Sequence, residues 1–400
     1  MKPSADFARG RAFMLCAEAP YPAVGGGALR SASLIEFLAQ RYNLDITLFT
    51  ERQTPDPRLS FPAGLARRIS VIDLRHHSKS PAARLWRMGR RVVSNRPPLI
   101  DRFSGYEKQV ADSIDGERYD LAILEHIWCA PYIEQVRPRA GCVLLDAHNI
   151  ESVWHERVGR TGPWHQRVAF RRFADACREF EGKWLAQFDS VIVTSEDDAR
   201  HVPRAIIYPN ALPFVDRPVR DEKQEIVFTG NLEYEPNIAA VRYFKDKIWP
   251  LLRERVPDVV WRIAGKNPQA IRAIVHGDSR ICVSGPMEDA IATLASAKIA
   301  VAPLLSGSGT RFKILEAWAA GTPVISTRIG AEGLPYRAGE HLLICEDPYE
   351  FAEAAAFLLS APEARVQLGE AGRRLYEARY TWEAAWSTLE HELSGLIQND

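Results

Sequence analysis

Short apolar runs alternate with helical patterns along the whole 400-residue chain. The first run, residues 12–17, precedes a glycine-containing loop and then residues 29–41, in which apolar side chains recur at helical spacing. Alternation of this kind predicts parallel sheets covered by helices, an α/β fold. The strands predicted after the first lie at residues 45–50, 69–74, 121–124, 142–145, 190–194, 225–229, 259–264, 281–284 and 298–302.

A change of composition divides this series of elements into two halves. Residues 201–218 contain four prolines, which favour a connection between domains over a continuous element. We therefore predict a first domain at residues 1–205, a second at 206–380, and a final helical segment at 381–400.

Charge and hydropathy exclude several classes of protein. The chain has 51 basic and 51 acidic side chains, so its net charge gives no general attraction to nucleic acid. We find no stretch of about 18 uninterrupted apolar residues that would span a membrane. Residues 1–11 are polar and lack the apolar core of a signal peptide, which predicts a cytoplasmic chain.

Neither cysteines nor carboxylates are spaced as metal ligands. The six cysteines are scattered, which predicts buried, reduced thiols. No Asp-x-Asp pair provides the simplest carboxylate clamp for a metal-bound nucleotide. We therefore expect no metal site and no essential cofactor.

Candidate functional residues are most concentrated in residues 298–326, a segment whose pattern predicts a strand, a loop, a helix and a further strand. The glycine-rich loop contains Gly307, Ser308 and Gly309, and the helix is predicted from Thr310. Backbone N–H groups at such a helix start, with the positive end of the helix dipole behind them, form a natural phosphate site.

Charged residues on the predicted helix extend this interpretation. Arg311 and Lys313 fall in its first turn, where cations oppose the helix dipole by roughly 0.3–1 kcal/mol, so a bound anion would offset them. Glu316 follows at a distance that suits the ribose diol of a bound nucleotide. The alternative is that the two cations are solvated and that Glu316 pairs with Lys313 at i,i+3.

Two segments carry a family resemblance: Gly307-Ser-Gly-Thr-Arg-Phe-Lys-Ile-Leu-Glu-Ala-Trp-Ala-Ala-Gly-Thr-Pro-Val-Ile-Ser-Thr and Gly330-Ala-Glu-Gly-Leu334. Together they resemble the nucleotide-sugar site of family 4 retaining glycosyltransferases, in the bacterial branch associated with exopolysaccharide synthesis. This resemblance implies the GT-B fold, in which two Rossmann-like domains face each other across a cleft and the C-terminal helix packs back on the first domain. It implies a nucleotide-sugar donor in the second domain, a glycan or polyprenyl-linked acceptor in the first, and transfer with retention and without an essential metal.

The chain departs from the family pattern at two places. The family usually has two glutamates eight residues apart; Glu316 matches the second, with an implied role in ribose binding, whereas Ser308 stands at the first. The family also commonly has Arg and Lys after the first strand of the nucleotide domain, but residues 230–236 contain neither. Arg311 and Lys313 are the substitutes we expect for neutralising the diphosphate.

Two features of the first half are further candidates. Gly25, Gly26 and Gly27 permit close backbone approach to a ligand, and in the resembling family a glycine loop here faces the donor phosphates; a flexible turn is the alternative. His148 lies in a polar group at a strand end, and its surroundings resemble the acceptor-side loop of the family. We expect it to orient sugar or acceptor, whereas His126 is interpreted as a packed or surface residue.

Two basic and aromatic regions are either solvated helix faces or contacts for anionic lipid headgroups or a polyprenyl-diphosphate acceptor. Residues 67–102 contain ten Lys or Arg, including a predicted amphipathic helix at 82–93, and residues 154–172 include Trp164, Arg167, Arg171 and Arg172. Contact with lipid headgroups would place the chain peripherally at the inner face of the cytoplasmic membrane. Rival functions are a nucleotide-sugar epimerase, a phosphorylase, or a catalytically silent sugar-nucleotide-binding subunit.

Overall fold

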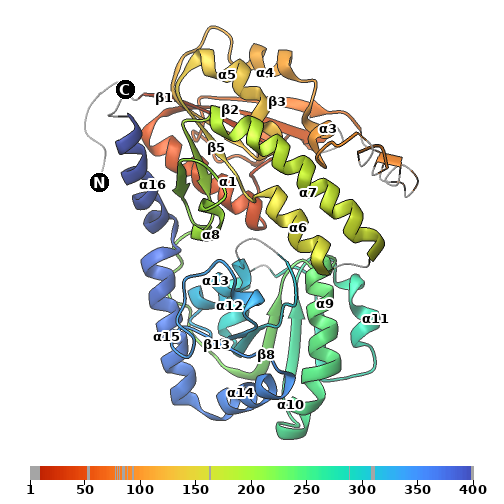
Figure 1. Cartoon of the computed structure of the whole chain (residues 1–400). Helices are drawn as coiled ribbons and strands as arrows, with labels where there is room; N and C mark the ends of the chain where they lie inside the picture. Colours follow the sequence, from red (N-terminus) through yellow and green to blue (C-terminus); the bar gives the residue numbers. More distant parts are fainter. Residues whose placement is uncertain are drawn as a thin grey trace. The chain divides into compact units, whose positions relative to one another are not determined.

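The computed structural model describes residues 10–51, 55–76, 78, 80, 82, 86–87, 89–91, 94–161, 164–287, 289–307 and 311–397. The chain forms two compact units (Figure 1). The first comprises Met1–Pro209 together with Trp386–Asp400, and the second comprises Asn210–Ala385.

The first unit is built on a seven-stranded sheet with every strand pair parallel. Its order, β3-β2-β1-β4-β5-β6-β7, reverses direction between β1 and β4, and ligands on sheets of this type sit beyond the carboxyl ends of the strands at such a switch point. The strands are β1 (Arg11–Cys16), β2 (Asn43–Glu51), β3 (Arg68–Leu74), β4 (Tyr119–Glu125), β5 (Ala140–Asp146), β6 (Ser190–Val193) and β7 (Ala205–Ile207).

Helices cover both faces of this sheet, with α4 and α5 on one side and α1 and α16 on the other (Figure 1). Alternate strand residues such as Phe13 and Leu15 belong to the core beside α4 and α5. The helices are α1 (Gly26–Arg41), α3 (Ile100–Phe103), α4 (Glu107–Ser113), α5 (Ile133–Val136), α6 (Glu151–Thr161), α7 (Trp164–Trp184), α8 (Glu196–Ala199) and α16 (Trp382–Ile397).

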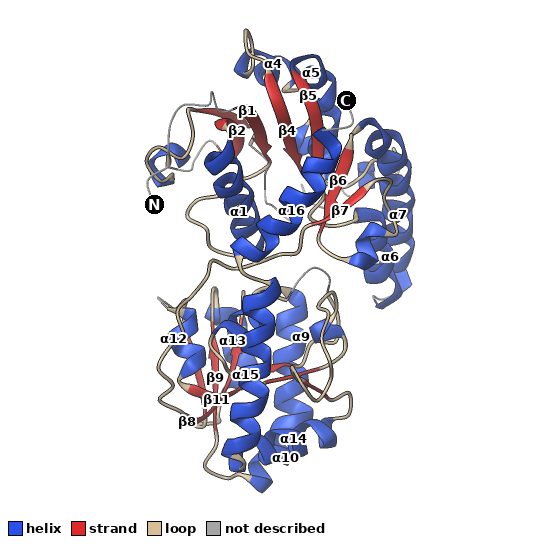
Figure 2. Ribbon diagram, turned by 90° about the vertical axis from the view of Figure 1, so that its left-hand side faces the viewer, coloured by secondary structure: helices blue, strands red, loops and turns tan. Residues whose placement is uncertain are grey.

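The predicted return of the C-terminal helix to the first domain is confirmed. Along α16, the Trp386 indole donates to the Ser33 carbonyl at 3.1 Å and its ring lies 6.4 Å from that of Phe37. Figure 2 shows α1 and α16 side by side. The last helix is therefore part of the first unit although it follows the second in the chain.

The second unit has a six-stranded parallel sheet of order β10-β9-β8-β11-β12-β13, which is the Rossmann order with its switch point between β8 and β11. Its strands are β8 (Lys223–Thr229), β9 (Val260–Ala264), β10 (Ile281–Ser284), β11 (Ala297–Ala302), β12 (Val324–Ser326) and β13 (Leu343–Ile344). Its helices are α9 (Glu235–Tyr243), α10 (Trp249–Arg255), α11 (Arg272–Val275), α12 (Ala290–Ala295), α13 (Phe312–Ala319), α14 (Pro348–Ser360) and α15 (Pro362–Arg379).

The predicted α/β class and its two parallel sheets are confirmed, and most predicted strands agree with the structure within two residues at each end. Strand β7 was not predicted because it lies in the proline-rich span. It pairs with β6, so the first unit extends to Pro209, four residues past the predicted boundary. The predicted helix at 82–93 lies partly outside the described residues.

The six cysteines are free thiols, as expected, but Cys282 is exposed whereas the others are buried. Among the described residues, no helix is both long enough and apolar enough to cross a membrane.

Candidate functional site

The segment singled out in the sequence lies at the switch point of the second sheet. Gly230 follows β8, and the loop that contains Gly307 follows β11 and leads to α13. Gly230 has φ +151°, and a Cβ built on it would lie 2.9 Å from Asn237 Nδ2 and 3.4 Å from Lys313 Nζ. A side chain here would therefore displace the Asn237 side chain, which binds Lys313, and this explains the glycine directly after the strand.

Lys313 is held by groups from neighbouring elements. Its Nζ donates to Asn237 Oδ1 at 2.7 Å and lies 4.0 Å from the centre of the Phe228 ring. Burial and the Arg311 guanidinium lower the pKa of Lys313 to about 7, although Glu316 acts in the opposite direction. Near neutral pH this ammonium is therefore only partly charged, and a bound anion would restore its charge.

Glu316 lies one turn further along α13. Its carboxylate makes no hydrogen bond or ion pair with any described residue, so the alternative i,i+3 pair with Lys313 is not present as a direct contact. Burial raises the pKa of Glu316 to about 7, while Lys313 lowers it. An acceptor of this kind, partly buried and without a protein donor, suits a ligand hydroxyl.

Arg311 immediately precedes α13, which begins at Phe312 rather than at the predicted Thr310. Its side chain is buried, and its Nη2 donates to the Ile329 carbonyl at 3.2 Å. Gly307 has φ +119°, and a Cβ there would lie 3.0 Å from the guanidinium. The absence of a side chain at Gly307 thus permits the close approach of the Arg311 guanidinium. The predicted phosphate-loop residues Ser308, Gly309 and Thr310 lie outside the described residues.

Two exposed cations at the same edge of the sheet were missed by the sequence reasoning. Lys266 follows β9 and Arg328 follows β12. Asn237, which holds Lys313, was also missed. The position of the cations directly after buried strands was the available signal, because the carboxyl ends of parallel strands share one edge.

In the first unit, Gly25, Gly26 and Gly27 lie at the start of α1. Gly25 is the N-cap, without a side-chain cap bond, and the first turn contains no acidic residue. A Cβ built on Gly27 would lie 3.9 Å from His148 Nδ1. The structure therefore brings two separate sequence candidates together, the glycine loop and His148.

His148 belongs to a buried charged cluster at the switch point between β1 and β4. Its Nε2 lies 3.1 Å from Asp146 Oδ2 and 3.4 Å from Glu125 Oε1, and its side chain is 9% exposed. The alignment of Nε2 with these oxygens does not meet hydrogen-bond geometry, so we treat the contacts as electrostatic. Its ring is 3.8 Å from that of His126, which also stacks on Trp128 at 4.5 Å. His126 is therefore a packed ring, as interpreted, although it packs directly against a candidate site residue.

Arg30 and Glu125 complete this cluster and were not found from the sequence. Arg30 Nε donates to both oxygens of Asp146 at 2.9 and 3.0 Å, and its Nη1 donates to the Tyr208 carbonyl at 2.7 Å. Glu125 accepts from Ser31 Oγ and from the Ala17 backbone. No local pattern predicts a pair 116 residues apart in the chain.

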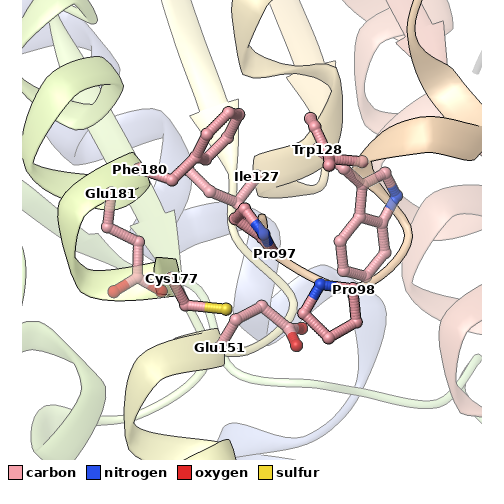
Figure 3. A pocket seen from close by; sticks show the side chains of 9 residues that line it. Pro97, Pro98, Ile127, Trp128, Glu151, Cys177, Phe180 and Glu181 are labelled. Atoms are coloured by element: carbon pink, nitrogen blue, oxygen red, sulfur yellow. The ribbon is translucent and has the colours of Figure 1, made fainter. Parts of the chain in front are cut away.

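A small cavity lies near this cluster in the same unit. It has a volume of about 10 Å³ and is lined by Pro97, Trp128, Glu151, Cys177 and other side chains (Figure 3). Burial, followed by the Glu181 carboxylate, raises the pKa of Glu151 to about 7. A space of this size holds one water molecule and no larger ligand.

The first basic region is partly neutralised. Arg90, Arg91 and Arg96 lie 3.7, 3.3 and 3.5 Å from Asp101, and Arg90 stacks over the exposed Trp86. In the second region Arg167, Arg171 and Arg172 are exposed, whereas the side chain of Trp164 lies outside the description.

Comparison with known proteins bears on the second unit most directly. Residues 223–361 match the family model for glycosyl transferases group 1. This match covers most of the second unit. A Klebsiella pneumoniae relative, described as an uncharacterized 44.6 kDa protein in the cps region, is 24% identical over 251 residues, which is 59% of this chain and 64% of that protein.

Solved glycosyltransferase structures resemble the whole chain. Sucrose-phosphate synthase from Thermosynechococcus elongatus is 18% identical with a TM-score of 0.71, and the match covers 98% of this chain and 100% of that one. S. aureus TarM is 14% identical with a TM-score of 0.69, over 98% and 99% of the two chains. Anabaena HepE, solved with UDP-glucose, is 12% identical with a TM-score of 0.63, over 96% and 99%. These likenesses show the GT-B fold.

Proposed function

We propose that this protein is a retaining glycosyltransferase that moves a sugar from a nucleoside-diphosphate donor to a glycan or polyprenyl-linked acceptor. The observation that carries the proposal is the group 1 family match over residues 223–361. That segment contains the switch point where Gly230, Lys313 and Glu316 gather. The relative from the cps region and the UDP-glucose complex of HepE support a sugar-nucleotide donor and a role in surface or exopolysaccharide synthesis.

The groups at α13 suit the chemistry of donor cleavage. Departure of a nucleoside diphosphate builds negative charge on the β-phosphate, and Arg311, Lys313 and the helix N-terminus would stabilise it without a metal. Glu316 would accept hydrogen bonds from the ribose. The leaving phosphate would help to remove the acceptor proton during attack on the same face of the sugar, so no covalent enzyme intermediate is required.

Calorimetry with single-site variants tests the donor site. Arg311→Ala and Lys313→Ala should each weaken UDP-glucose binding by about 1.5–3 kcal/mol, since charge-assisted hydrogen bonds are of this size. The affinity for uridine, which lacks phosphate, should change much less. Equal losses for the two ligands would contradict the phosphate assignment.

Turnover separates the proposed transferase from its rivals. With lipid extract as acceptor source, a transferase releases UDP from UDP-glucose only when acceptor is present. An epimerase interconverts the donor sugar without acceptor, and a phosphorylase requires free phosphate. A silent subunit, which Ser308 at the first glutamate position favours, would bind the donor without turnover.

Peripheral membrane contact is a separable part of the proposal. Replacing Arg87, Arg90 and Arg91 with Gln should weaken binding to phosphatidylglycerol vesicles, because each basic side chain near an anionic surface contributes about 1 kcal/mol. UDP-glucose affinity should stay unchanged. The membrane contact is excluded if the unaltered chain does not bind these vesicles.

A further inference from the structure

The cluster around His148 contains four charged or chargeable groups that share one buried volume. The Arg30, Asp146 and Glu125 side chains are 1%, 0% and 1% exposed. The Arg30 guanidinium is bound to both oxygens of Asp146 and to a backbone carbonyl. Glu125 is fixed by Ser31 and by the Ala17 amide. Each group is therefore held in place by contacts from more than one element.

Charge balance specifies the state of His148. If His148 were neutral, the two carboxylates would be balanced by one guanidinium, which leaves one uncompensated negative charge away from water. His148 Nε2 lies 3.1 Å from Asp146 Oδ2 and 3.4 Å from Glu125 Oε1, close enough for its charge to interact with both carboxylates. A lone pair on Nε2 would face both anions, whereas a proton there, with a second on Nδ1, makes the cluster neutral.

We infer that His148 is a fixed imidazolium and that Arg30 is a positioning residue, which holds Asp146 in the orientation that keeps His148 charged and aligned. The inferred role rests on the proposed function. His148 Nδ1 lies beside the glycine loop at the start of α1, since a Cβ built on Gly27 would lie 3.9 Å from it, and its N–H donates a hydrogen bond to a phosphate or sugar oxygen of a ligand bound at this loop. An imidazolium cannot accept the acceptor proton, so His148 is not the general base.

The surrounding titratable groups agree with this state. Burial alone would lower the pKa of His148, but Asp146 and then Glu125 raise it to about 9. Burial and the charge of His148 lower the pKa of His126, which stays neutral. The Cys16 thiol also lies close enough to interact with both carboxylates, and burial raises its pKa so that it too is uncharged.

A divalent metal is the competing occupant of the same place. Ligand atoms of Glu125, Asp146 and His148 all lie within 4.8 Å of one another. However, Asp146 already accepts two hydrogen bonds from Arg30, and a dication bound to neutral His148, in place of the one extra proton of the imidazolium, would leave the buried cluster positively charged. The proton satisfies the charge balance and the metal does not.

NMR titration of histidine-labelled full-length protein tests the protonation state. The His148 signal, assigned by its loss in His148→Gln, should remain that of an imidazolium to above pH 8. In Asp146→Asn the same ring should titrate at least one unit lower, and Glu125→Gln should act in the same direction if the first variant does not fold. Titration of the unaltered His148 at or below 6.5 would overturn the inference, as would stoichiometric zinc binding that is lost in His148→Gln.

The pH profile of turnover tests the role of Arg30. Arg30→Lys keeps the charge but cannot form the forked bond, so UDP-glucose turnover should fall at least tenfold while the His148 signal broadens or shifts. In Asp146→Asn, turnover at saturating UDP-glucose should fall more steeply as the pH rises through neutrality than it does in the unaltered enzyme. Unchanged turnover and His148 signal in Arg30→Lys would remove its positioning role. The NMR titration needs no substrate. It therefore tests the charge state of His148 even if the protein has no transferase activity.

Discussion

The two switch points of this molecule treat buried charge in opposite ways. In the first unit, Arg30, Glu125, Asp146 and His148 neutralise one another within a closed set of contacts. In the second unit, Lys313 and Glu316 are brought close without a direct bond, and burial shifts the pKa of each to about 7. The first arrangement fixes one protonation state, whereas the second leaves two groups whose charges a ligand would complete.

This difference implies that the two sites contribute differently to the free energy of unfolding of the ligand-free protein. A closed ion cluster is sensitive to the loss of a single member, because the remaining buried charge is then uncompensated. Buried charges that lack an opposite charge in direct contact reduce the free energy of unfolding but supply interaction energy when a ligand binds. We therefore expect substitutions in the first cluster to act mainly on stability and substitutions on α13 to act mainly on binding.

The largest expected effect is on folding. Arg30→Met should reduce the free energy of unfolding by about 3–5 kcal/mol, because it leaves Asp146 buried beside a second carboxylate without its main partner. Urea denaturation measures this loss. The exposed pair Arg41–Glu390, at 2.9 Å, provides a matched control: Arg41→Met should cost about 0–1 kcal/mol.

The double variant Arg30→Met/Asp146→Asn sharpens this test. It removes one charge of each sign and leaves Glu125 opposite His148, so we expect it to be more stable than Arg30→Met alone. Equal stability of the single and double variants would show that the cluster is not balanced as one unit.

The fold was largely readable from the sequence, because buried parallel strands are continuous apolar runs separated by helical patterns. The α13 candidates were found because loop, helix start and charges are contiguous in the chain. Arg30 and Glu125 were not found, since their role depends on a sheet order that joins residues about a hundred positions apart. Strand β7 was missed because its three residues lie among prolines, and pairing with β6 decides its conformation.

The next largest effect concerns the ribose. Glu316→Gln should weaken UDP-glucose binding by about 1.5–3 kcal/mol, or roughly ten- to hundredfold, because the amide has only one acceptor oxygen and no charge. Calorimetry at pH 8, where Glu316 is mostly ionised, measures the change. Glu363→Gln, at the exposed start of α15, should have no effect.

The ligand itself provides the stricter comparison. The unaltered protein should bind UDP much more tightly than 2′,3′-dideoxy-UDP, and Glu316→Gln should lose most of that discrimination. If the variant discriminates as strongly as the unaltered protein, the carboxylate does not contact the ribose.

The smallest effect, and the one that separates the two sites most directly, is the pH dependence of donor binding. The binding-competent form has Lys313 charged and Glu316 ionised. Because the pKa of Lys313 is lowered to about 7, raising the pH above 7 removes its proton. The affinity for UDP-glucose should then fall by at most about tenfold for each pH unit. Because the pKa of Glu316 is raised to about 7, lowering the pH neutralises it, and affinity should fall on that side too. The unaltered protein should therefore bind UDP-glucose best near pH 7.

Three variants separate the two sides of this profile. Lys313→Arg keeps the cation charged, so only the rise in affinity through pH 7 should remain. Glu316→Gln should leave only the fall in affinity, and that fall should begin at or below pH 7 because the carboxylate no longer stabilises the ammonium. His148→Gln should leave both limbs in place, since that residue keeps its charge across this range; a profile that changes with His148 and not with Lys313 would reverse the assignment of which site responds to pH.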